Sequence, residues 1–154
     1  MDAVKTVPAA SDTTRPAGSV DTLVRLTAAD MVRVNALITE RMDSPVPVIP
    51  ALAEHLISAG GKRLRPLLTL AAARISGSQG DACLNLAAAV EFIHTATLLH
   101  DDVVDGSQLR RGKVAAHLIW GGSASVWGGE VLCARAFELM VDTGCLRALQ
   151  RLAR

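Results

Sequence analysis

The sequence contains no tyrosine, and its other aromatic residues are limited to Phe92, Phe137, Trp120 and Trp127. It also lacks long β-branched runs, and Ala and Leu dominate the 50% of residues that are hydrophobic. Such a composition favours packed helices over sheets. An excess of charge of one sign is missing too. The formal net charge is +1, so no overall field would draw the chain to nucleic acid or to an anionic membrane.

Cysteines are few, and the sequence shows no secretory signal. We interpret the three cysteines, which lack the spacing of metal ligands, as core residues in a reducing cytoplasm: Cys83, Cys133 and Cys145. The N-terminus has no basic region followed by an apolar stretch. The longest apolar tract, residues 82–99, contains Glu91 and His94. Because charge at the centre of a bilayer is costly, this tract favours a buried helix over a membrane span.

The chain is predicted to consist of a disordered tail, residues 1–20, and one helical domain, residues 21–154. The tail is rich in Ala, Ser, Thr, Asp and Pro and has no apolar period. Helix-start and helix-stop signals predict a first helix that begins at a capping box at Thr27–Asp30 and ends near Asp43. Further helices are predicted at residues 50–58, 65–75, 81–105 and 124–141, and residues 114–119 are predicted to be a short helix or an irregular piece. The predicted fold class is all-α, with antiparallel helices joined by short loops.

Two aspartates near the end of the long predicted helix form a candidate metal site. Asp101 and Asp105 are four residues apart and therefore lie on one face of a helix, where their charges repel. A bound Mg²⁺ would remove this conflict, because it prefers carboxylate oxygens together with water and phosphate oxygens. Asp102 lies beside this face and would support it. A solvated helix end with three acids is the alternative, and the choice between the two depends on the surrounding residues.

His94 lies two helical turns before Asp101 on the same side of the helix, where it could donate a hydrogen bond to a phosphate oxygen. Taken alone, His94 is more typical of a core histidine with its hydrogen bonds satisfied.

Two basic segments accompany the acidic helix. Residues 60–66 combine two glycines, three cations and a helix start, and Lys62 and Arg65 could converge on one diphosphate. Arg63 is expected to face outward. The second segment, residues 109–113 with Arg110 and Arg111, could simply pair with the nearby acids. It could instead clamp two diphosphates, one bound through a metal and one without.

Four segments together resemble the trans-isoprenyl diphosphate synthase family, also called polyprenyl synthetases. They are GGKRLRP at 60–66, EFIHTATLLHDDVVD at 91–105, LRRGK at 109–113 and WGGSASVWGGEVLCARAFELM at 120–140. The resemblance implies the N-terminal portion of the isoprenoid synthase helical bundle. It also implies an enzyme that condenses isopentenyl diphosphate with an allylic diphosphate and uses Mg²⁺ as cofactor. The full-length protein would be a homodimer.

Roles for individual residues follow from this resemblance. Isopentenyl diphosphate would be held by Lys62, Arg65, His94 and Arg111. Asp101 and Asp105, with Asp102 in support, would bind the Mg²⁺ that bridges the allylic diphosphate, and Arg110 would contact that diphosphate directly. Product length would depend on Ala96 and Thr97, with Ile93 deeper. The small side chain of Ala96 resembles that of the family members that make long quinone side chains.

The sequence departs from the family in two respects. Glu130 stands where the family usually has Asp after Gly129. The resemblance also covers only about the first half of a family member, and no second aspartate-rich motif is found up to Arg154. We therefore expect the 154 residues to be inactive by themselves, as a truncated fragment or a non-catalytic interaction module. A class I terpene cyclase also uses DDxxD, but such an enzyme needs no second diphosphate site.

Overall fold

The fold is built almost entirely from helices, which confirms the all-α prediction. The computed structural model describes residues 20–58, 61, 63–78 and 80–153. In these ranges the elements are α1 (Val20–Arg41), α2 (Val48–Ser58), α3 (Leu64–Ile75), α4 (Ala82–Val104), β1 (Leu109–Arg110), β2 (Lys113–Val114), α5 (Ala116–Trp120), α6 (Gly122–Asp142) and α7 (Leu146–Leu152). The strands form one antiparallel ribbon in which Leu109 pairs with Val114 and Arg110 pairs with Lys113. The predicted tail lies outside the described residues, except for Val20 at the start of α1.

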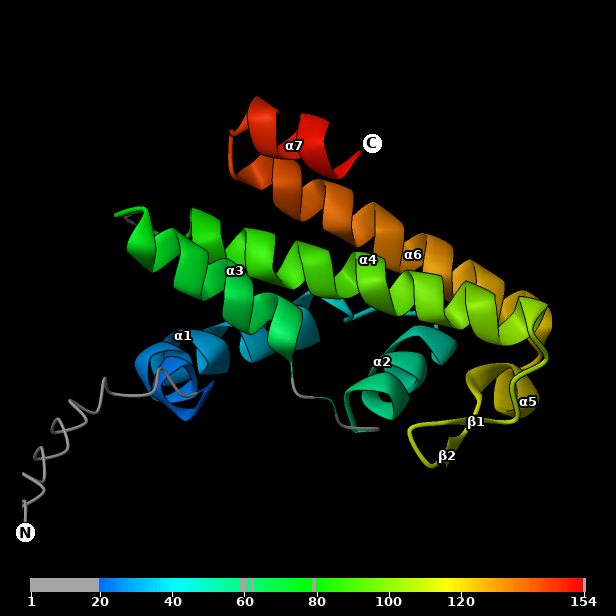
Figure 1. Ribbon diagram of the computed structural model, residues 1–154. Helices are drawn as coiled ribbons and strands as arrows, with labels where there is room; N and C mark the ends of the chain where they lie inside the picture. The colour runs from blue at the N-terminus through cyan, green and yellow to red at the C-terminus, as the bar shows by residue number, and fades with distance from the viewer. Residues whose placement is uncertain (1–19, 59–60, 62, 79, 154) are drawn as a thin grey trace, which may run out of the picture.

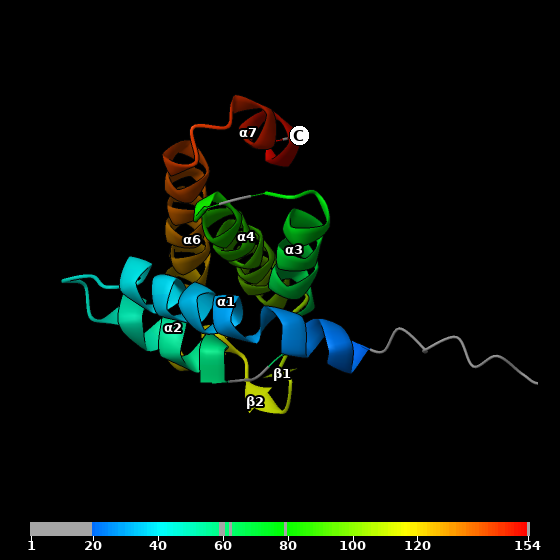
Figure 2. The same ribbon diagram turned by 90° about the vertical axis from the view of Figure 1, so that its left-hand side faces the viewer.

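α4 is the central helix of the bundle. Figure 1 shows α4 and α6 running side by side, with α7 beyond α6. In Figure 2, α6, α4 and α3 form one layer, and α1 and α2 run across its lower side. Contacts from α1, α3, α5 and α6 all reach α4, so this helix carries its side chains into the middle of the fold.

The core follows from this arrangement. Three consecutive alanines of α4, Ala87, Ala88 and Ala89, are all fully buried, so neighbouring helices approach it from several sides. Leu99 of α4 and Leu139 of α6 are also buried, with 1% and 0% of their surface exposed. Burying one such leucine stabilises the fold by about 1.5–3 kcal/mol.

α4 is also long and apolar enough to cross a membrane by length and composition, and 44% of that window is buried inside the fold. Its central place in the bundle accounts for the same apolar composition, because a helix surrounded by others needs apolar residues on most of its faces.

Local signals predicted most helix ends correctly. α1 ends at Arg41, close to the end predicted near Asp43, and α3 and α4 begin and end within about two residues of the predicted positions. Gly106 adopts a positive φ of 63° and turns the chain after α4. α6 ends at Asp142, one residue beyond the predicted end, and the short helix α7 that follows it was not predicted.

The predicted capping box at Thr27 is wrong, and the start of α4 has no side-chain cap. α1 begins at Val20 rather than at Thr27, and Thr27 is buried in its third turn, where its hydroxyl donates to the carbonyl of Leu23 at 2.8 Å. Asp81 does precede α4, but its side chain makes no capping bond and instead pairs with Arg33 of α1 at 2.7 Å. The Thr27 hydroxyl thus bonds within its own helix, whereas at Asp81 a tertiary ion pair takes the place of a cap.

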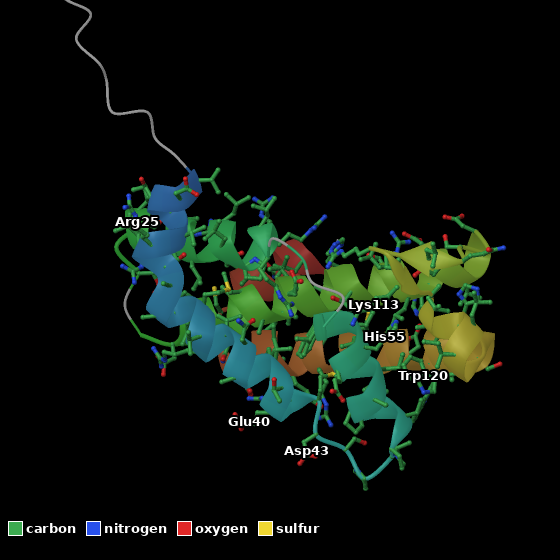
Figure 3. All side chains as sticks on the ribbon, turned by 90° about the horizontal axis from the view of Figure 1, so that it is seen from below. Arg25, Glu40, Asp43, His55, Lys113 and Trp120 are labelled. Atoms are coloured by element: carbon green, nitrogen blue, oxygen red, sulfur yellow. The ribbon has the colours of Figure 1, made fainter. Side chains whose placement is uncertain are left out.

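α2 is tied to the ribbon and to α5 through His55. Its Nε2 donates to the carbonyl of Val114 in β2 at 3.0 Å, and its ring meets that of Trp120 edge to face at 5.3 Å between centroids. Figure 3 shows His55, Lys113 and Trp120 close together at this junction. The contact places the ribbon, and with it Arg110 and Arg111, against the body of the fold.

Candidate functional site

The acidic end of α4 presents two carboxylates to solvent. Asp101 and Asp105 are both exposed, and Asp105 closes the helix with its N–H donating to the carbonyl of Asp101 at 2.8 Å. Among the described residues neither side chain makes a hydrogen bond or an ion pair. Two unneutralised carboxylates one turn apart are suited to share a divalent cation.

Asp102 differs from its neighbours because it is buried. Its side chain is 5% exposed and accepts hydrogen bonds from Nε of Arg110 at 3.0 and 3.2 Å and from Nη2 of the same residue. The hydrogen bonds to Asp102 raise the pKa of Arg110, and the charges of Asp101 and Asp105 add to this effect. Asp102 therefore holds the ribbon against the end of α4, close to the two exposed carboxylates.

His94 lies half-buried on α4 and lines a cleft together with Arg65 of α3. Burial lowers its pKa below 6.5, and the positive charges of Arg65, Arg111 and Arg110 lower it further, whereas Glu91 acts in the opposite direction. The imidazole is therefore neutral at pH 7 and can donate from one ring nitrogen to an anion.

Gly61 brings the two basic segments together. A Cβ at Gly61 would overlap the guanidinium of Arg111, so the backbone at Gly61 packs directly on that side chain. The absence of a side chain is what permits this close approach. Lys62, the next residue and a predicted diphosphate ligand, lies outside the described residues.

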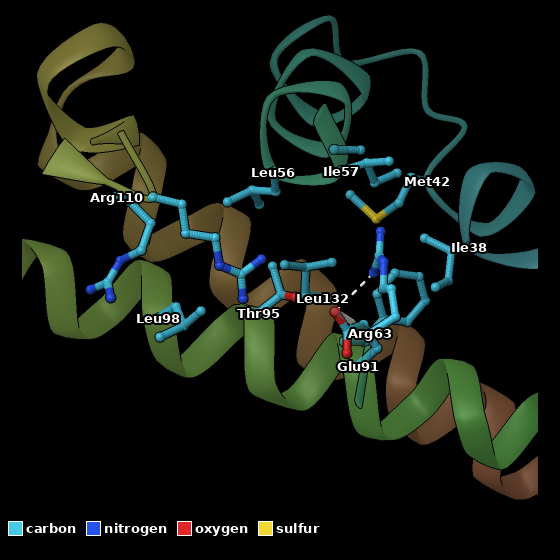
Figure 4. Close-up of a pocket in the computed structure, with 13 residues that line it drawn as sticks. Ile38, Met42, Leu56, Ile57, Arg63, Glu91, Thr95, Leu98, Arg110 and Leu132 are labelled. Atoms are coloured by element: carbon cyan, nitrogen blue, oxygen red, sulfur yellow. Dashed lines mark hydrogen bonds and ion pairs between the residues drawn. The ribbon is translucent and has the colours of Figure 1, made fainter. Parts of the chain in front are cut away.

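The expected outward orientation of Arg63 is wrong. Its guanidinium turns inward and pairs with Glu91 of α4 at 2.8 Å, and the two side chains are only 19% and 9% exposed. Figure 4 shows this pair on the wall of a pocket that Leu98, Leu132 and Arg110 also line. Glu91 was missed as a functional candidate, although an acid inside an otherwise apolar tract was a signal that it needed a partner.

The two positions predicted to govern product length differ in their surroundings. Ala96 is fully buried in the core, whereas Thr97 is exposed and its hydroxyl donates to the carbonyl of His94 at 2.7 Å.

Gly129 and Glu130 play separate parts near the acidic end. A Cβ at Gly129 would overlap the ring of His100, whose Nε2 donates to the carbonyl of Val126 at 3.1 Å. Gly129 is therefore required for the close contact of α6 with α4. The carboxylate of Glu130 lies 3.7 Å from His100 and is 67% exposed, so its extra methylene meets no packing constraint.

Taken together, the described residues place an acid pair, a neutral histidine and several arginines along α4. In this part of the chain no group of three or more His, Cys, Asp or Glu side chains converges as a preformed metal cage. A cation at Asp101 and Asp105 would therefore take its remaining ligands from water and substrate oxygens, as Mg²⁺ commonly does.

The chain is similar to prenyl diphosphate synthases in both sequence and structure. The polyprenyl synthetase family model matches residues 46–154. Octaprenyl diphosphate synthase of Escherichia coli (strain K12) is 47% identical over 132 residues, which cover 86% of this chain and 41% of that protein.

Solved structures agree. A polyprenyl synthase from Caulobacter crescentus CB15, complexed with calcium and isoprenyl diphosphate, is 72% identical with a TM-score of 0.86 over 91% of this chain and 43% of its own. A decaprenyl diphosphate synthase from Rhodobacter capsulatus is 57% identical with a TM-score of 0.85, over 88% and 42%.

The chain spans about two fifths of the length of the curated relatives that it matches. The family model covers most of the chain itself, including α4, both strands of the ribbon and α6. On this evidence the chain belongs to the polyprenyl synthetase family.

Proposed function

We propose that these residues form part of a trans-prenyltransferase that condenses isopentenyl diphosphate with an allylic diphosphate to make a long all-trans polyprenyl diphosphate. One observation carries the proposal: α4 presents the unpaired carboxylates of Asp101 and Asp105 at its end, while the neutral His94, nearer its middle, lines a cleft with Arg65 and feels the charge of Arg111. Two diphosphates need such a division, because one can be held through a metal and the other through cations alone.

Asp101 and Asp105 would hold Mg²⁺ in this proposal. The two exposed carboxylates fit the ion, since neither is occupied by another partner among the described residues. When bound, Mg²⁺ would neutralise charge on the allylic diphosphate and so favour its departure.

The protein groups then orient the two substrates. Arg65, His94 and Arg111, with Lys62, would hold isopentenyl diphosphate. Arg110, now bonded to Asp102, would also reach the allylic diphosphate, since a guanidinium has donors for both partners. As the allylic C–O bond breaks, the double bond of isopentenyl diphosphate forms the new C–C bond. The proton then lost from the adjacent carbon goes to the released pyrophosphate.

A long product is supported by similarity to proteins named octaprenyl and decaprenyl diphosphate synthases, and by the small Ala96 beside Thr97. A homodimeric, cytoplasmic full-length protein without a membrane span completes the proposal. The exposed side chains of Trp127, Phe137 and Val141 on α6 support a dimer, and the central place of α4 supports the absence of a span.

Binding and turnover test the proposal separately. Calorimetry on the 154-residue chain is expected to detect binding of isopentenyl diphosphate without Mg²⁺. Binding of farnesyl diphosphate should be detected only with Mg²⁺. Asp101→Asn combined with Asp105→Asn should abolish the second binding event and leave the first. No binding of isopentenyl diphosphate by the wild-type chain would overturn the assignment.

Turnover is followed with Mg²⁺, farnesyl diphosphate and labelled isopentenyl diphosphate. We expect no elongation by the chain alone, because its described residues supply one carboxylate pair for the metal. Labelled long-chain product would contradict this expectation and establish the activity directly. Cyclised hydrocarbon formed from farnesyl diphosphate alone would favour a terpene cyclase. The second, metal-free site at Arg65, His94 and Arg111 argues against a cyclase, because a cyclase binds only one diphosphate.

A further inference from the structure

The ion pair between Arg63 and Glu91 is largely buried, so it is a poor source of stability and needs another explanation. Glu91 is one of few charged residues buried in the described part of the chain, and its partner comes from a loop rather than from a neighbouring turn. Removing a carboxylate from water is unfavourable unless a well-oriented partner compensates for it. Replacing such a pair by apolar residues is often neutral or stabilising, so its presence calls for another reason.

The backbone conformation of Arg63 also indicates a role for this ion pair. Arg63 precedes α3 in the left-handed region, with φ 46° and ψ 37°, and its carbonyl accepts the N–H of Leu67 at 3.0 Å. A non-glycine residue is strained there, and such strain persists only where surrounding contacts impose it. The bond to Glu91 is the contact that the structure provides for this side chain.

Arg63 lies between two residues that contact the predicted diphosphate ligands. Gly61, two residues before it, packs on the guanidinium of Arg111, and Arg65, two residues after it, lines the cleft beside His94. With Arg63 turned inward, the loop is fixed to α4 at a point between these two contacts. The pair also neutralises Glu91, which otherwise would repel an anion bound near His94.

We propose that Arg63 and Glu91 are positioning residues that fix residues 63–66 on α4, so that Arg65 and Arg111 meet His94 around one diphosphate, while neither Arg63 nor Glu91 touches that diphosphate. This inference rests on the proposed function for the identity of the ligand, isopentenyl diphosphate. The geometric part of it can be tested without any ligand.

Calorimetry with isopentenyl diphosphate separates positioning from direct contact. If the pair positions the loop, Glu91→Leu should weaken binding about tenfold, as Arg63→Leu does, and the double variant should be no weaker than either, because partners in one contact are not additive. If Arg63 instead contacts the diphosphate, Glu91→Leu should leave affinity unchanged or improve it. That result would overturn the proposal.

A matched control is available on the same helix. Arg74, near the end of α3, pairs with Asp30 of α1 at 2.7 Å, so Arg74→Leu also breaks a pair that joins α3 to another helix. It should leave the affinity for isopentenyl diphosphate unchanged. Circular dichroism must show folded protein at the assay temperature. If the Leu variants do not fold, Glu91→Asp and Arg63→Lys replace them, since both keep the charge but shift its position. An unchanged affinity in both would equally overturn the proposal.

A ligand-free readout separates failure of this inference from failure of the proposed function. Arg63→Leu frees Arg65 to move away from His94 and leaves Glu91 without its partner, and both changes should raise the pKa of His94 in an NMR titration. Arg74→Leu should not change it. A pKa of His94 unaffected by Arg63→Leu refutes the positioning role, even if the wild-type chain binds the diphosphate. Conversely, a raised pKa in a chain that binds no diphosphate leaves the loop geometry supported and refutes only the ligand.

Discussion

His94 lies among charges of both signs, and each neighbour changes its pKa in a known direction. Burial is the largest cause of the lowered pKa, and Arg65 is the next. The folded protein therefore binds fewer protons than the unfolded chain just below pH 6.5, so the contribution of His94 to stability is lost as the pH falls below that value. A diphosphate bound beside it would act against Arg65 and favour the protonated imidazole.

Replacing Arg65 by Gln should therefore raise the pKa of His94 towards 6.5, without reaching it, because burial remains. The imidazole proton resonances of the ligand-free protein, followed by NMR as a function of pH, measure this shift. Arg135→Gln is the control, since Arg135 lies on α6 and pairs with Glu138 at 2.9 Å. An equal pKa of His94 in the wild-type and Arg65→Gln proteins would contradict the assigned proximity of the two side chains.

The two positions predicted to govern product length allow a paired test. Ala96→Tyr places a ring in a fully buried site, so we expect it to shorten the product and also to destabilise the fold by about 1–3 kcal/mol. Thr97→Tyr changes an exposed position and should leave the unfolding midpoint nearly unchanged. Product length is measured in the full-length enzyme by chromatography, and stability by denaturant unfolding. Products of wild-type length from both variants would exclude these positions as determinants.

At the scale of the helices, the contact between α4 and α6 depends on a residue without a side chain. Gly129→Ala would drive a methyl group into the ring of His100 and break the hydrogen bond from that ring to Val126. Overpacking costs about 1–3 kcal/mol, and the better helix propensity of alanine returns only about 0.5–1 kcal/mol. The free energy of unfolding should therefore fall.

Gly122 is the matched control for this prediction. A Cβ there would lie 3.6 Å from the side chain of Val103, an ordinary contact, so Gly122→Ala should be neutral or stabilising. Urea unfolding of both variants gives the comparison. A Gly129→Ala protein as stable as Gly122→Ala would mean that His100 moves aside without cost.

Sequence reasoning reached what local residues determine. Pro45 and Gly106 mark chain turns by their own backbone preferences, and the spacing of Asp101 and Asp105 on one helical face needs only the helix. It failed where a distant partner decides the outcome. Arg63 turns inward because Glu91, 28 residues away, needs a cation, and Asp81 leaves its helix end for an arginine 48 residues away. The apolar tract around Glu91 signals that this acid needs a partner, but the local sequence identifies neither Arg63 nor Arg33 as the partner.

At the scale of the whole molecule, metal and diphosphate should act together on stability. Asp101 and Asp105 supply only two carboxylates, so Mg²⁺ alone should bind weakly and leave the unfolding temperature nearly unchanged. Mg²⁺ with inorganic pyrophosphate completes the ligand set and should stabilise the folded state. At about one hundred times the dissociation constant, the gain is about 2.7 kcal/mol. For a domain of this size that corresponds to a rise of several degrees, about 2–4 °C per kcal/mol.

Thermal unfolding with Mg²⁺, with pyrophosphate, with both, and with both plus excess EDTA measures this effect. Asp101→Asn combined with Asp105→Asn should remove the part of the stabilisation that needs Mg²⁺, and so should EDTA. Pyrophosphate held by Arg65, His94 and Arg111 should still raise the unfolding temperature without metal. Asp43→Asn, which changes an exposed acid beyond the end of α1, should behave as wild type. If the Mg²⁺-dependent rise in unfolding temperature survives the double Asn substitution, the metal does not bind at the end of α4. If the substitution removes only this Mg²⁺-dependent rise, the acid pair and the basic segments bind diphosphate independently.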